Sequence, residues 1–263
     1  MQYFGFCREP FARDISADKI YQSDAHKEFS MRFNHMLEHR GLMLLTGESG
    51  AGKTTAIRSL IAALNTKQFY PIYLPLATVG VSDFYRQLNA ALGGEQKFFK
   101  TALYRSIQER LTNFAAAKHL LPVIVLDEAH LLKDQNLREL QLIVNFKMDT
   151  VTPALFVLAG QSYLRKRLES PMLESIAQRI VLSYQLPSLG EEETAAYIRY
   201  HLEYAGLSVC IVNEKACRVI AQFSNGLPRK IGAITLNALR YAAIKKEKVI
   251  DENIIFLAAK EVI

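Results

Sequence analysis

The chain has 263 residues, of which half are hydrophobic and 22% are charged, and its formal net charge is +6. This length favours one large domain with a smaller second one, and the composition excludes a disordered or low-complexity chain. Because the first residues lack the pattern of a secretory signal and no segment approaches ~20 uninterrupted apolar residues, we expect a cytoplasmic protein without a membrane span.

Residues 1–40 are expected to lead into the first domain. The phenylalanines and the proline among the first eleven positions indicate an irregular segment. This segment either packs on the core beside a ligand or forms a hydrophobic strap without ligand contact, and the sequence leaves both open. A helix is predicted from about Ser23 to His39, with Ser23 or Asp24 as its N-cap and an apolar face that includes Phe29.

The strongest motif of the chain is the stretch Gly47-Glu48-Ser49-Gly50-Ala51-Gly52-Lys53-Thr54-Thr55, which has the form G-x-x-x-x-G-K-[ST]. An apolar run precedes it and a helical pattern follows it, which is the strand, loop and helix context that this motif requires. The glycines allow successive backbone N–H groups to point at a polyphosphate, and the helix N-terminus adds partial positive charge. We therefore predict an ATP site in which Lys53 lies along the β- and γ-phosphates and the Thr54 hydroxyl ligates Mg²⁺.

A basic, aromatic segment follows the next predicted elements, a strand at 69–74 and a helix that begins at Ser82 or Asp83. The segment contains Lys97, Phe98, Phe99, Lys100, Tyr104 and Arg105. Interleaved cations and aromatic rings suit nucleic-acid backbones and bases. They equally suit a solvated helix whose apolar face is buried, so the sequence leaves both interpretations open.

The second strong motif is an apolar strand at 123–126 that runs into Asp127 and Glu128. Such a pattern is typical of a buried parallel strand that ends at a metal site. We expect Asp127 to hold Mg²⁺ through its water shell and Glu128 to orient and polarise the attacking water. Phosphoryl transfer needs little from a protein beyond positioning and charge stabilisation, so these two acids suffice.

Together, Gly47–Thr54 and the run Leu126-Asp127-Glu128-Ala129-His130 resemble the motifs of the AAA+ superfamily. Three further stretches narrow the resemblance to the ExeA-like branch: the lead-in Tyr3–Phe11, the run Asn145–Asp149, and Leu158–Gln161. That branch includes general secretion pathway protein A and the ATPase subunits that accompany transposases, which are similar to the TniB, TnsC and MuB proteins. The resemblance covers nearly the whole chain.

The resemblance implies three further site residues. Gln161 follows a predicted strand at 154–159 and matches the polar sensor 1, although Ser162 is an alternative. Arg179 matches the arginine finger that reaches into the neighbouring subunit's site, where a guanidinium neutralises charge on the transferring phosphoryl group. Arg229 matches sensor 2, a cation that the lid brings to the nucleotide phosphates. The alternatives are a salt-bridged surface arginine at 179 and a solvated helix-start arginine at 229.

The fold class that we predict is α/β: a P-loop AAA+ domain with a parallel sheet of five central strands, residues 1–187, and a smaller helical lid, residues 188–263. Helices are expected to begin near Glu191, Asn213, Pro228 and Asp251, and ATP with Mg²⁺ is expected to bind between the domains. The three cysteines of the chain lack metal-ligand spacing and are predicted to be reduced thiols in or near the core.

The first hypothesis for function is a transposition helper, an ATPase that assembles on DNA when ATP is bound, recruits or regulates a transposase, and disassembles on hydrolysis. The alternative is a secretion-type ATPase that drives assembly of an envelope complex without DNA. Members of that type continue into a membrane span and a peptidoglycan-binding part, whereas this chain stops at Ile263, which together with the positive charge favours the transposition hypothesis. A DNA-binding module with almost no turnover is a third possibility, against which Glu128 argues.

The partners implied by the first hypothesis are double-stranded DNA, bound largely without sequence preference, a transposase, and further copies of the chain in a ring or helical filament. No membrane partner is expected. Position in the family architecture assigns the DNA contacts to five basic residues: Lys97, Lys100, Arg105, Lys133 and Arg138. Each also fits an ordinary solvated side chain, and many basic proteins bind no nucleic acid, so the charge alone does not decide between the hypotheses.

Overall fold

The computed structural model describes residues 2–75, 80–116, 119–145 and 152–262, so most of the run Asn145–Asp149 lies outside the described residues. Contacts divide the chain into two compact units. The sheet unit comprises Glu28–Gly47 and Ala56–Leu186, and the helical unit comprises Met1–Lys27, Glu48–Thr55 and Pro187–Ile263. The N-terminal residues thus belong with the C-terminal helices, and the domain division at residues 187 and 188 stays a prediction.

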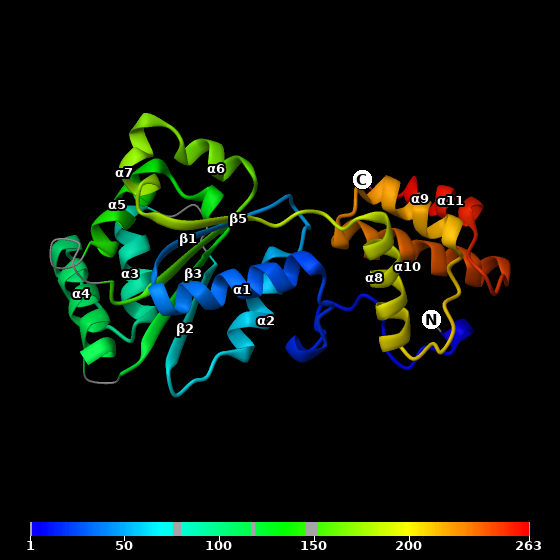
Figure 1. The fold of residues 1–263 in the computed structure, drawn as a ribbon, viewed down its shortest axis with the longest axis horizontal. Coiled ribbons are helices and arrows are strands. Elements are labelled where there is room, and N and C mark those ends of the chain that lie inside the picture. The colour runs from blue at the N-terminus through cyan, green and yellow to red at the C-terminus, as the bar shows by residue number, and fades with distance from the viewer. Residues whose placement is uncertain (1, 76–79, 117–118, 146–151, 263) are drawn as a thin grey trace. The chain divides into compact units, whose positions relative to one another are not determined.

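The sheet unit is built on five parallel strands in the order β2-β3-β4-β1-β5 (Figure 1). The strands are β1 Gly41–Thr46, β2 Phe69–Pro75, β3 Leu121–Asp127, β4 Leu155–Gly160 and β5 Ile180–Gln185. The predicted α/β class with five central parallel strands is confirmed. Because the carboxyl ends of parallel strands meet at one edge of a sheet, the residues that follow β1, β3 and β4 emerge at the same edge.

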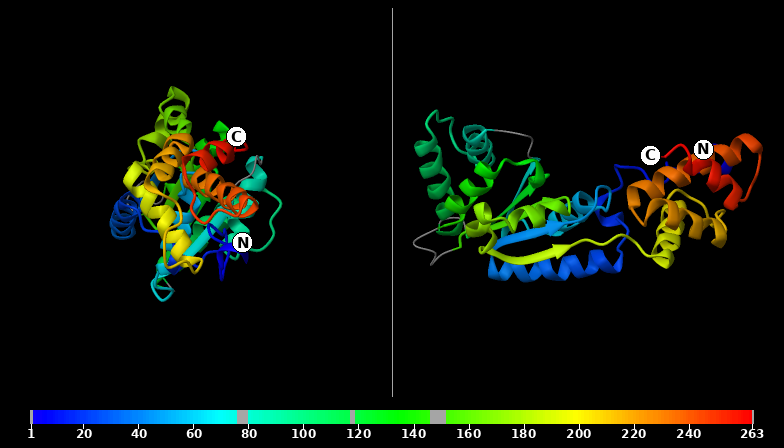
Figure 2. Two further views of the ribbon diagram at one scale, coloured as in Figure 1. Left: turned by 90° about the vertical axis from the view of Figure 1, so that its right-hand side faces the viewer. Right: turned by 90° about the horizontal axis from the view of Figure 1, so that it is seen from above.

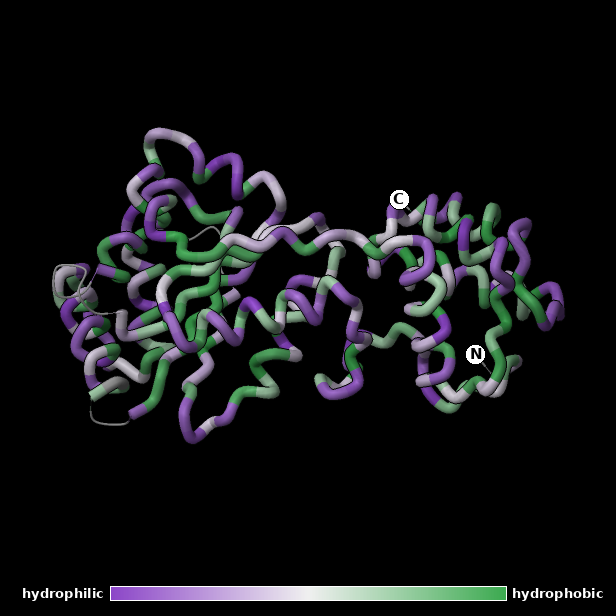
Figure 3. Tube along the Cα trace, in the orientation of Figure 1, coloured by the Kyte–Doolittle hydropathy of each residue, from purple (hydrophilic) through white to green (hydrophobic). Residues whose placement is uncertain are grey.

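The central strands are buried on both faces. Every residue of β3 and β4 is buried, and in Figure 3 the trace along the central strands is mostly hydrophobic. Successive side chains of a strand point to opposite faces. On one face, Leu42 and Leu44 pack in the cluster formed with the helices α3 (Val81–Ala91), α4 (Lys100–Ala116) and α5 (Asp134–Val144). On the other face lies helix α1, Asp24–His39 (Figure 2). Its Phe29 stacks on Tyr184 of β5 at a centroid distance of 6.0 Å.

The described residues contain seven helices associated with the sheet, among them the helices predicted from about Ser23, after the phosphate loop and from about Ser82. They are α1 Asp24–His39, α2 Lys53–Ala63, α3 Val81–Ala91, α4 Lys100–Ala116, α5 Asp134–Val144, α6 Tyr163–Leu168 and α7 Glu174–Ala177. Short 3-10 helices lie at Gln2–Phe4, Ala17–Lys19, Ala129–Leu131 and Pro171–Leu173. The start of α3 differs from the prediction, because Gly80 is its N-cap and no side chain caps it.

The helical unit contains α8 Glu191–Tyr204, α9 Glu214–Ser224, α10 Pro228–Lys245 and α11 Glu252–Ala259 around one apolar cluster. Side-chain caps set two of the starts: Asn213 Oδ1 accepts from the Ala216 backbone N–H at 2.7 Å, and Asp251 Oδ1 accepts from that of Ile254 at 3.0 Å. Pro228 occupies the first turn of α10, as predicted. Within the described residues, none of the helices combines the length and the apolar character needed to cross a bilayer.

The N-terminal segment lies on the helices of this unit. Phe11 stacks on His201 with ring centroids 4.8 Å apart, and a Cβ on Gly232 would lie 3.2 Å from the Phe11 Cβ, so glycine permits the close approach. The hydrophobic packing expected of this segment is present. All three cysteines are free. Cys217 is buried and Cys210 is half-buried, but Cys7 is exposed, so the expected placement in or near the core is wrong for Cys7.

Candidate nucleotide site

The predicted phosphate-binding loop joins β1 to α2, and its glycines adopt backbone angles that other residues avoid. Gly50 has φ +85° and Gly52 has φ +98°. Both values fall in the left-handed region that favours glycine. The Ala51 N–H donates to the Glu48 carbonyl at 3.1 Å and closes a tight turn. The loop therefore has the curvature that a backbone cradle for phosphates requires.

Lys53 and Thr54 begin helix α2, which places both at a helix N-terminus, where partial positive charge favours an anion. Lys53 is 7% exposed, and its Nζ donates to the Glu48 carbonyl at 3.0 Å. A buried ammonium needs compensation for lost hydration, and a phosphate oxygen supplies more than a carbonyl does. Thr54 and Thr55 are exposed.

Arg229, the expected sensor 2, lies beside this loop within the helical unit. Its backbone N–H donates to the Gly50 carbonyl at 3.3 Å. A Cβ built on Gly50 would lie 3.0 Å from the Arg229 Cβ, so residue 50 has little room for a side chain. Arg229 is exposed at the start of α10. A cation from the C-terminal helices thus sits next to the predicted phosphate loop.

Asp127 ends β3 with both carboxylate oxygens in hydrogen bonds. Oδ2 accepts from the Tyr73 hydroxyl at 2.7 Å, and Oδ1 accepts from the Glu128 N–H at 2.8 Å. Asp127 is 2% exposed. Burial raises the pKa of Tyr73, and the hydrogen bond to Asp127 raises it further, so the phenol stays protonated as a donor. These bonds fix the orientation of the carboxylate at the sheet edge.

Glu128 follows in the left-handed region at φ 54° and ψ 30°, which a residue other than glycine rarely adopts. This turn leaves the glutamate side chain 49% exposed while its neighbour His130 is 3% exposed. Strained backbone of this kind is typical of functional sites. The geometry presents one accessible carboxylate next to one buried carboxylate.

Gln161 and Ser162 follow β4, the strand that pairs with β3, at the same edge as Asp127. The Gln161 N–H donates to His130 Nδ1 at 3.3 Å. The Ser162 hydroxyl is buried and has no hydrogen-bond partner among the described residues. Both candidates for sensor 1 therefore remain open.

Arg179 lies at the amino-terminal ends of the parallel strands, opposite the ends where Asp127 lies. It directly precedes β5, and its neighbour Ile180 pairs with Leu42 near the start of β1. The strands run from that edge toward Asp127, about 3.3 Å per residue. The structure therefore does not bring Arg179 together with the acids that follow β3 in the same sheet unit.

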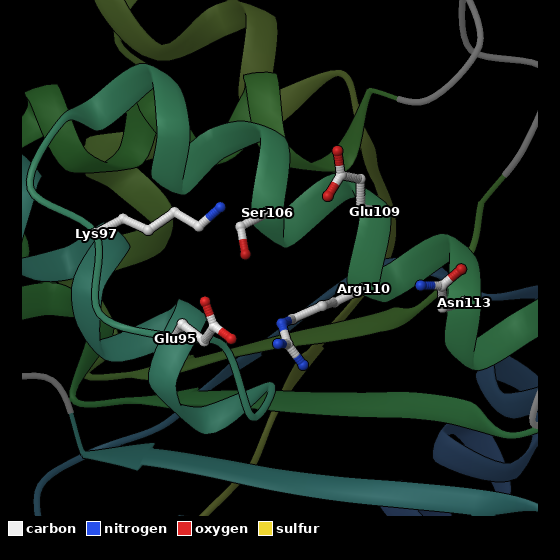
Figure 4. A pocket seen from close by; sticks show the side chains of 6 residues that line it. All are labelled: Glu95, Lys97, Ser106, Glu109, Arg110 and Asn113. Carbon is white, nitrogen blue, oxygen red and sulfur yellow. The ribbon is translucent and has the colours of Figure 1, made fainter.

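The five basic residues expected to contact DNA differ in their surroundings. Arg105, Lys133 and Arg138 are exposed. Lys100 Nζ lies 2.6 Å from Glu139 Oε1, so its charge is partly compensated. Lys97 lines a pocket of about 270 Å³ with Glu95, Ser106, Glu109, Arg110 and Asn113, in which two acids balance two bases (Figure 4). Figure 4 shows Glu95 and Arg110 pointing toward each other across this pocket.

Sequence reasoning missed two residues at the carboxyl edge of the sheet, Tyr73 and His130. Tyr73 lies on β2, 54 positions before the carboxylate it binds, and no local pattern links the two. His130 belongs to the quoted Leu126–His130 run, but the backbone N–H that it accepts from lies at the end of β4. For Tyr73, the one available signal was the alternation of apolar residues along β2, which places this tyrosine between buried Ile72 and Leu74.

Comparisons with known proteins identify the family of the chain and structures that share its fold. A family model described as an AAA domain matches residues 35–168. General secretion pathway protein A of Aeromonas hydrophila is 34% identical over 270 residues, covering 99% of this chain and 48% of that protein. The chain thus spans about half the length of this relative.

Three solved structures share the fold over most of the chain. Cdc6p from Pyrobaculum aerophilum has a TM-score of 0.69 at 15% identity, covering 96% of this chain and 70% of that chain. The Aeropyrum pernix ORC2 protein in its ADP form has 0.68 at 14%, covering 96% and 72%. The Thermotoga maritima RuvB Holliday junction branch migration motor has 0.59 at 20%, covering 95% and 72%.

The fold and the loop define a P-loop protein of the AAA+ type, whose fold implies nucleotide binding. The chain belongs to the AAA domain family, and it is related to General secretion pathway protein A.

Proposed function

We propose that the protein hydrolyses ATP with Mg²⁺. The observation that carries the proposal is that two sequence motifs follow parallel strands of one sheet. The glycine-containing loop that leads into Lys53 follows β1, and the two acids follow β3. In this proposal Gly47–Thr55 cradle the phosphates and Lys53 neutralises the β- and γ-phosphates. Glu128 positions the attacking water.

The residues present fit Mg²⁺. A hydroxyl from Thr54 and a carboxylate from Asp127 are the hard oxygen ligands that this ion prefers, and it commonly takes only one or two protein ligands beside phosphate oxygens and water. The described residues contain no cluster of three or more His, Cys, Asp or Glu side chains that could hold a metal ion. Asp127 would hold the ion through its water shell, and the ion would neutralise charge on the phosphates.

We further propose that Arg229 contributes a cation to the phosphates and that Arg179 serves a neighbouring copy. Arg229 is supported by its position against Gly50. Arg179 lies at the opposite sheet edge from Asp127, so a role in phosphoryl transfer requires assembly of several subunits, as a ring or a filament. The polar side chain of Gln161 or Ser162 would lie between the γ-phosphate and the two acids.

Two substitutions test the hydrolysis proposal. Lys53→Ala removes a cation from the phosphates and is expected to abolish ATP binding. Glu128→Gln removes only the group that orients water, so ATP binding is expected to persist while turnover stops. Lys67→Ala and Glu169→Gln, which alter exposed residues of the same types, are the matched controls. Equal loss of ATP affinity at positions 53 and 128 would contradict the role given to Glu128.

Mixing experiments test Arg179. If it acts in trans, Arg179→Ala subunits mixed with Lys53→Ala subunits regain some hydrolysis, because a mixed interface holds one intact site. The measurement is ATPase rate against mixing ratio. Turnover by a strictly monomeric wild-type protein would refute the trans assignment.

For the process that hydrolysis drives, we propose assembly of an envelope complex of the secretion type. The support is the relative with 34% identity over 99% of this chain, which bears the name General secretion pathway protein A. In this role the ATP-bound form binds a protein partner without DNA.

The second candidate is a DNA-bound transposition helper. The net charge of +6 favours it, as do the exposed cations Arg105, Lys133 and Arg138. Phe98 and Phe99, which are 82% and 76% exposed, add rings that can stack on bases. Lys97 and Lys100 support it less, because neighbouring acids balance their charge.

A salt titration of fluorescent duplex binding separates the two candidates. With a slowly hydrolysed ATP analogue, a DNA-bound assembly loses affinity by ~0.9 log units per log unit of salt for each phosphate neutralised. Arg138→Ala would lower this slope without changing sequence preference. Absence of duplex binding at low salt, or binding indifferent to ATP and ADP, leaves the secretion-type role.

A further inference from the structure

One guanidinium group binds the segment that follows Asp127, residues 128–134, which we call the Glu128 turn. Arg167 of α6 donates from Nη1 to the His130 carbonyl at 3.0 Å and from Nη2 to the Leu132 carbonyl. Its Nε donates to Asp134 Oδ1 at 2.7 Å, and its Nη2 lies 2.5 Å from the same oxygen. All three nitrogens of the group therefore bind this turn.

The Glu128 turn needs such a restraint because its first residue is strained. A left-handed conformation like that of Glu128 persists only where the surrounding structure determines it. Two hydrogen bonds close the turn locally: the Leu131 N–H donates to the Glu128 carbonyl at 2.8 Å, and the Leu132 N–H donates to the Ala129 carbonyl at 3.2 Å. Because both bonds lie within the turn, they do not attach it to another element, whereas the bonds from Arg167 attach it to α6.

Helix α6 is a firm support for Arg167. Leu164 and Leu168, which lie before and after it in the helix, are buried in the core of the sheet unit. A Cβ on Gly160 at the end of β4 would lie 2.7 Å from Leu164 Cδ2 and 3.2 Å from the His130 backbone nitrogen. The strand end, the helix and the Glu128 turn are therefore in close contact.

The set of acceptors requires the shape of an arginine. A guanidinium carries five N–H donors in a rigid plane, so it can bind the two carbonyls and the Asp134 carboxylate at the same time. A lysine ammonium is a compact charge on a flexible stem. It could pair with Asp134, but it would not hold both carbonyls in one geometry.

We propose that Arg167 is a positioning residue for ATP hydrolysis, which holds the Glu128 turn so that the Glu128 carboxylate faces the attacking water. It acts through the backbone of the turn, and its guanidinium binds the carbonyls of the turn and the Asp134 carboxylate. This inference rests on the proposed hydrolysis of ATP. It assigns to Arg167 an effect on kcat and not on ATP affinity, because Glu128 orients water and does not hold the nucleotide.

Arg167→Ala removes the guanidinium, and Arg165→Ala is the matched control. Arg165 lies on the same helix, is exposed, and has its Nε 3.9 Å from Glu169 Oε1. We expect Arg167→Ala to lower kcat by about tenfold to a hundredfold, since a misplacement of about 1 Å can cost about a hundredfold in rate. Affinity for a fluorescent ATP analogue should not change. Arg165→Ala should keep both kcat and this affinity.

Chemical rescue separates the hydrogen bonds of the fork from a general loss of stability. Arg167 is half-buried, so a small ion can reach the space that Arg167→Ala leaves. Guanidinium ion should restore part of kcat, because it can bind the two carbonyls again. Methylammonium carries the same charge without the planar fork and should not restore it. A merely structural role of Arg167 would give no such difference between the two ions.

Arg167→Lys is the second variant for the case in which Arg167→Ala does not fold. It keeps a cation beside Asp134, and kcat should still fall because one ammonium does not hold both carbonyls. Thermal melting shows that each variant is folded at the temperature of the assay.

The results decide between the inference and its foundation. A wild-type protein without ATP turnover overturns the proposed function and the role of Arg167 with it. If the wild type turns over, undiminished kcat in Arg167→Ala overturns the inference alone. An equal loss in Arg165→Ala, a loss of ATP affinity that accounts for the lost turnover, or the lack of a guanidinium-specific regain also overturns it. Where only Arg167→Lys folds, an unchanged kcat has the same meaning.

Discussion

Acid is expected to destabilise the helical unit through His201. This side chain is 5% exposed between Phe11 and Tyr197, whose ring centroids lie 4.8 and 4.5 Å from its own. Its Nδ1 is buried without a hydrogen-bond partner in the described part of the chain. Burial lowers the pKa of His201 from 6.5 to about 4, because the charged imidazolium would lose its hydration.

The sign and the size of the change in the free energy of unfolding follow from the linkage between proton binding and folding. Below pH 6.5 the His201 imidazole is protonated in the unfolded chain, whereas in the folded chain it stays neutral down to about pH 4. The free energy of unfolding therefore decreases as the pH falls through this window. Each pH unit costs about 1.4 kcal/mol, which gives about 3 kcal/mol over the window and about 2 kcal/mol by pH 5. Above pH 6.5 the contribution of His201 is constant.

The comparison is wild type against His201→Phe, which keeps a ring against Phe11 and removes the titrating group. Urea unfolding followed by circular dichroism at pH 7.5 and pH 5.0 gives the free energy of unfolding, and hydrogen exchange in α8 reports the same unit locally. Between these two pH values the wild type should lose about 2 kcal/mol more than the variant. Equal losses in the two proteins would refute the assignment, since the other titrating groups are common to both.

Three further changes have defined outcomes. Gly226→Ala should lower the melting temperature, because Gly226 has φ +68° and an added Cβ would lie 2.0 Å from the Leu189 carbonyl oxygen; the φ angle alone costs about 1–2 kcal/mol. Asn213→Ala removes the cap of α9 and should cost about 1 kcal/mol in urea unfolding. Tyr73→Phe removes the donor to Asp127, so the Mg²⁺ concentration for half-maximal ATP turnover should rise by about tenfold or more. An unchanged Mg²⁺ requirement would mean that the phenol does not orient this carboxylate.

The local elements could be predicted from the sequence because their causes are local. The motif around Lys53 contains its own glycines at the positions that need positive φ, and the continuous apolar run before Asp127 is what a strand buried on both faces requires. Asn213 and Pro228 mark helix starts through their own chemistry. The α/β class and the five strands follow from the order of these signals.

Tertiary structure alone decided which distant residues meet. Nothing near Tyr73 indicates that its hydroxyl lies 2.7 Å from Asp127, because that contact depends on the pairing of β2 with β3. The approach of Gln161 to His130 requires the register of β3 and β4, and the packing of Phe11 on His201 joins the two ends of the chain. The sequence by itself determined which groups have the chemistry for phosphate and metal. Which partners orient those groups was decided only by folding, because a hydrogen bond depends on distances and angles that strand pairing and packing impose on residues far apart in the chain.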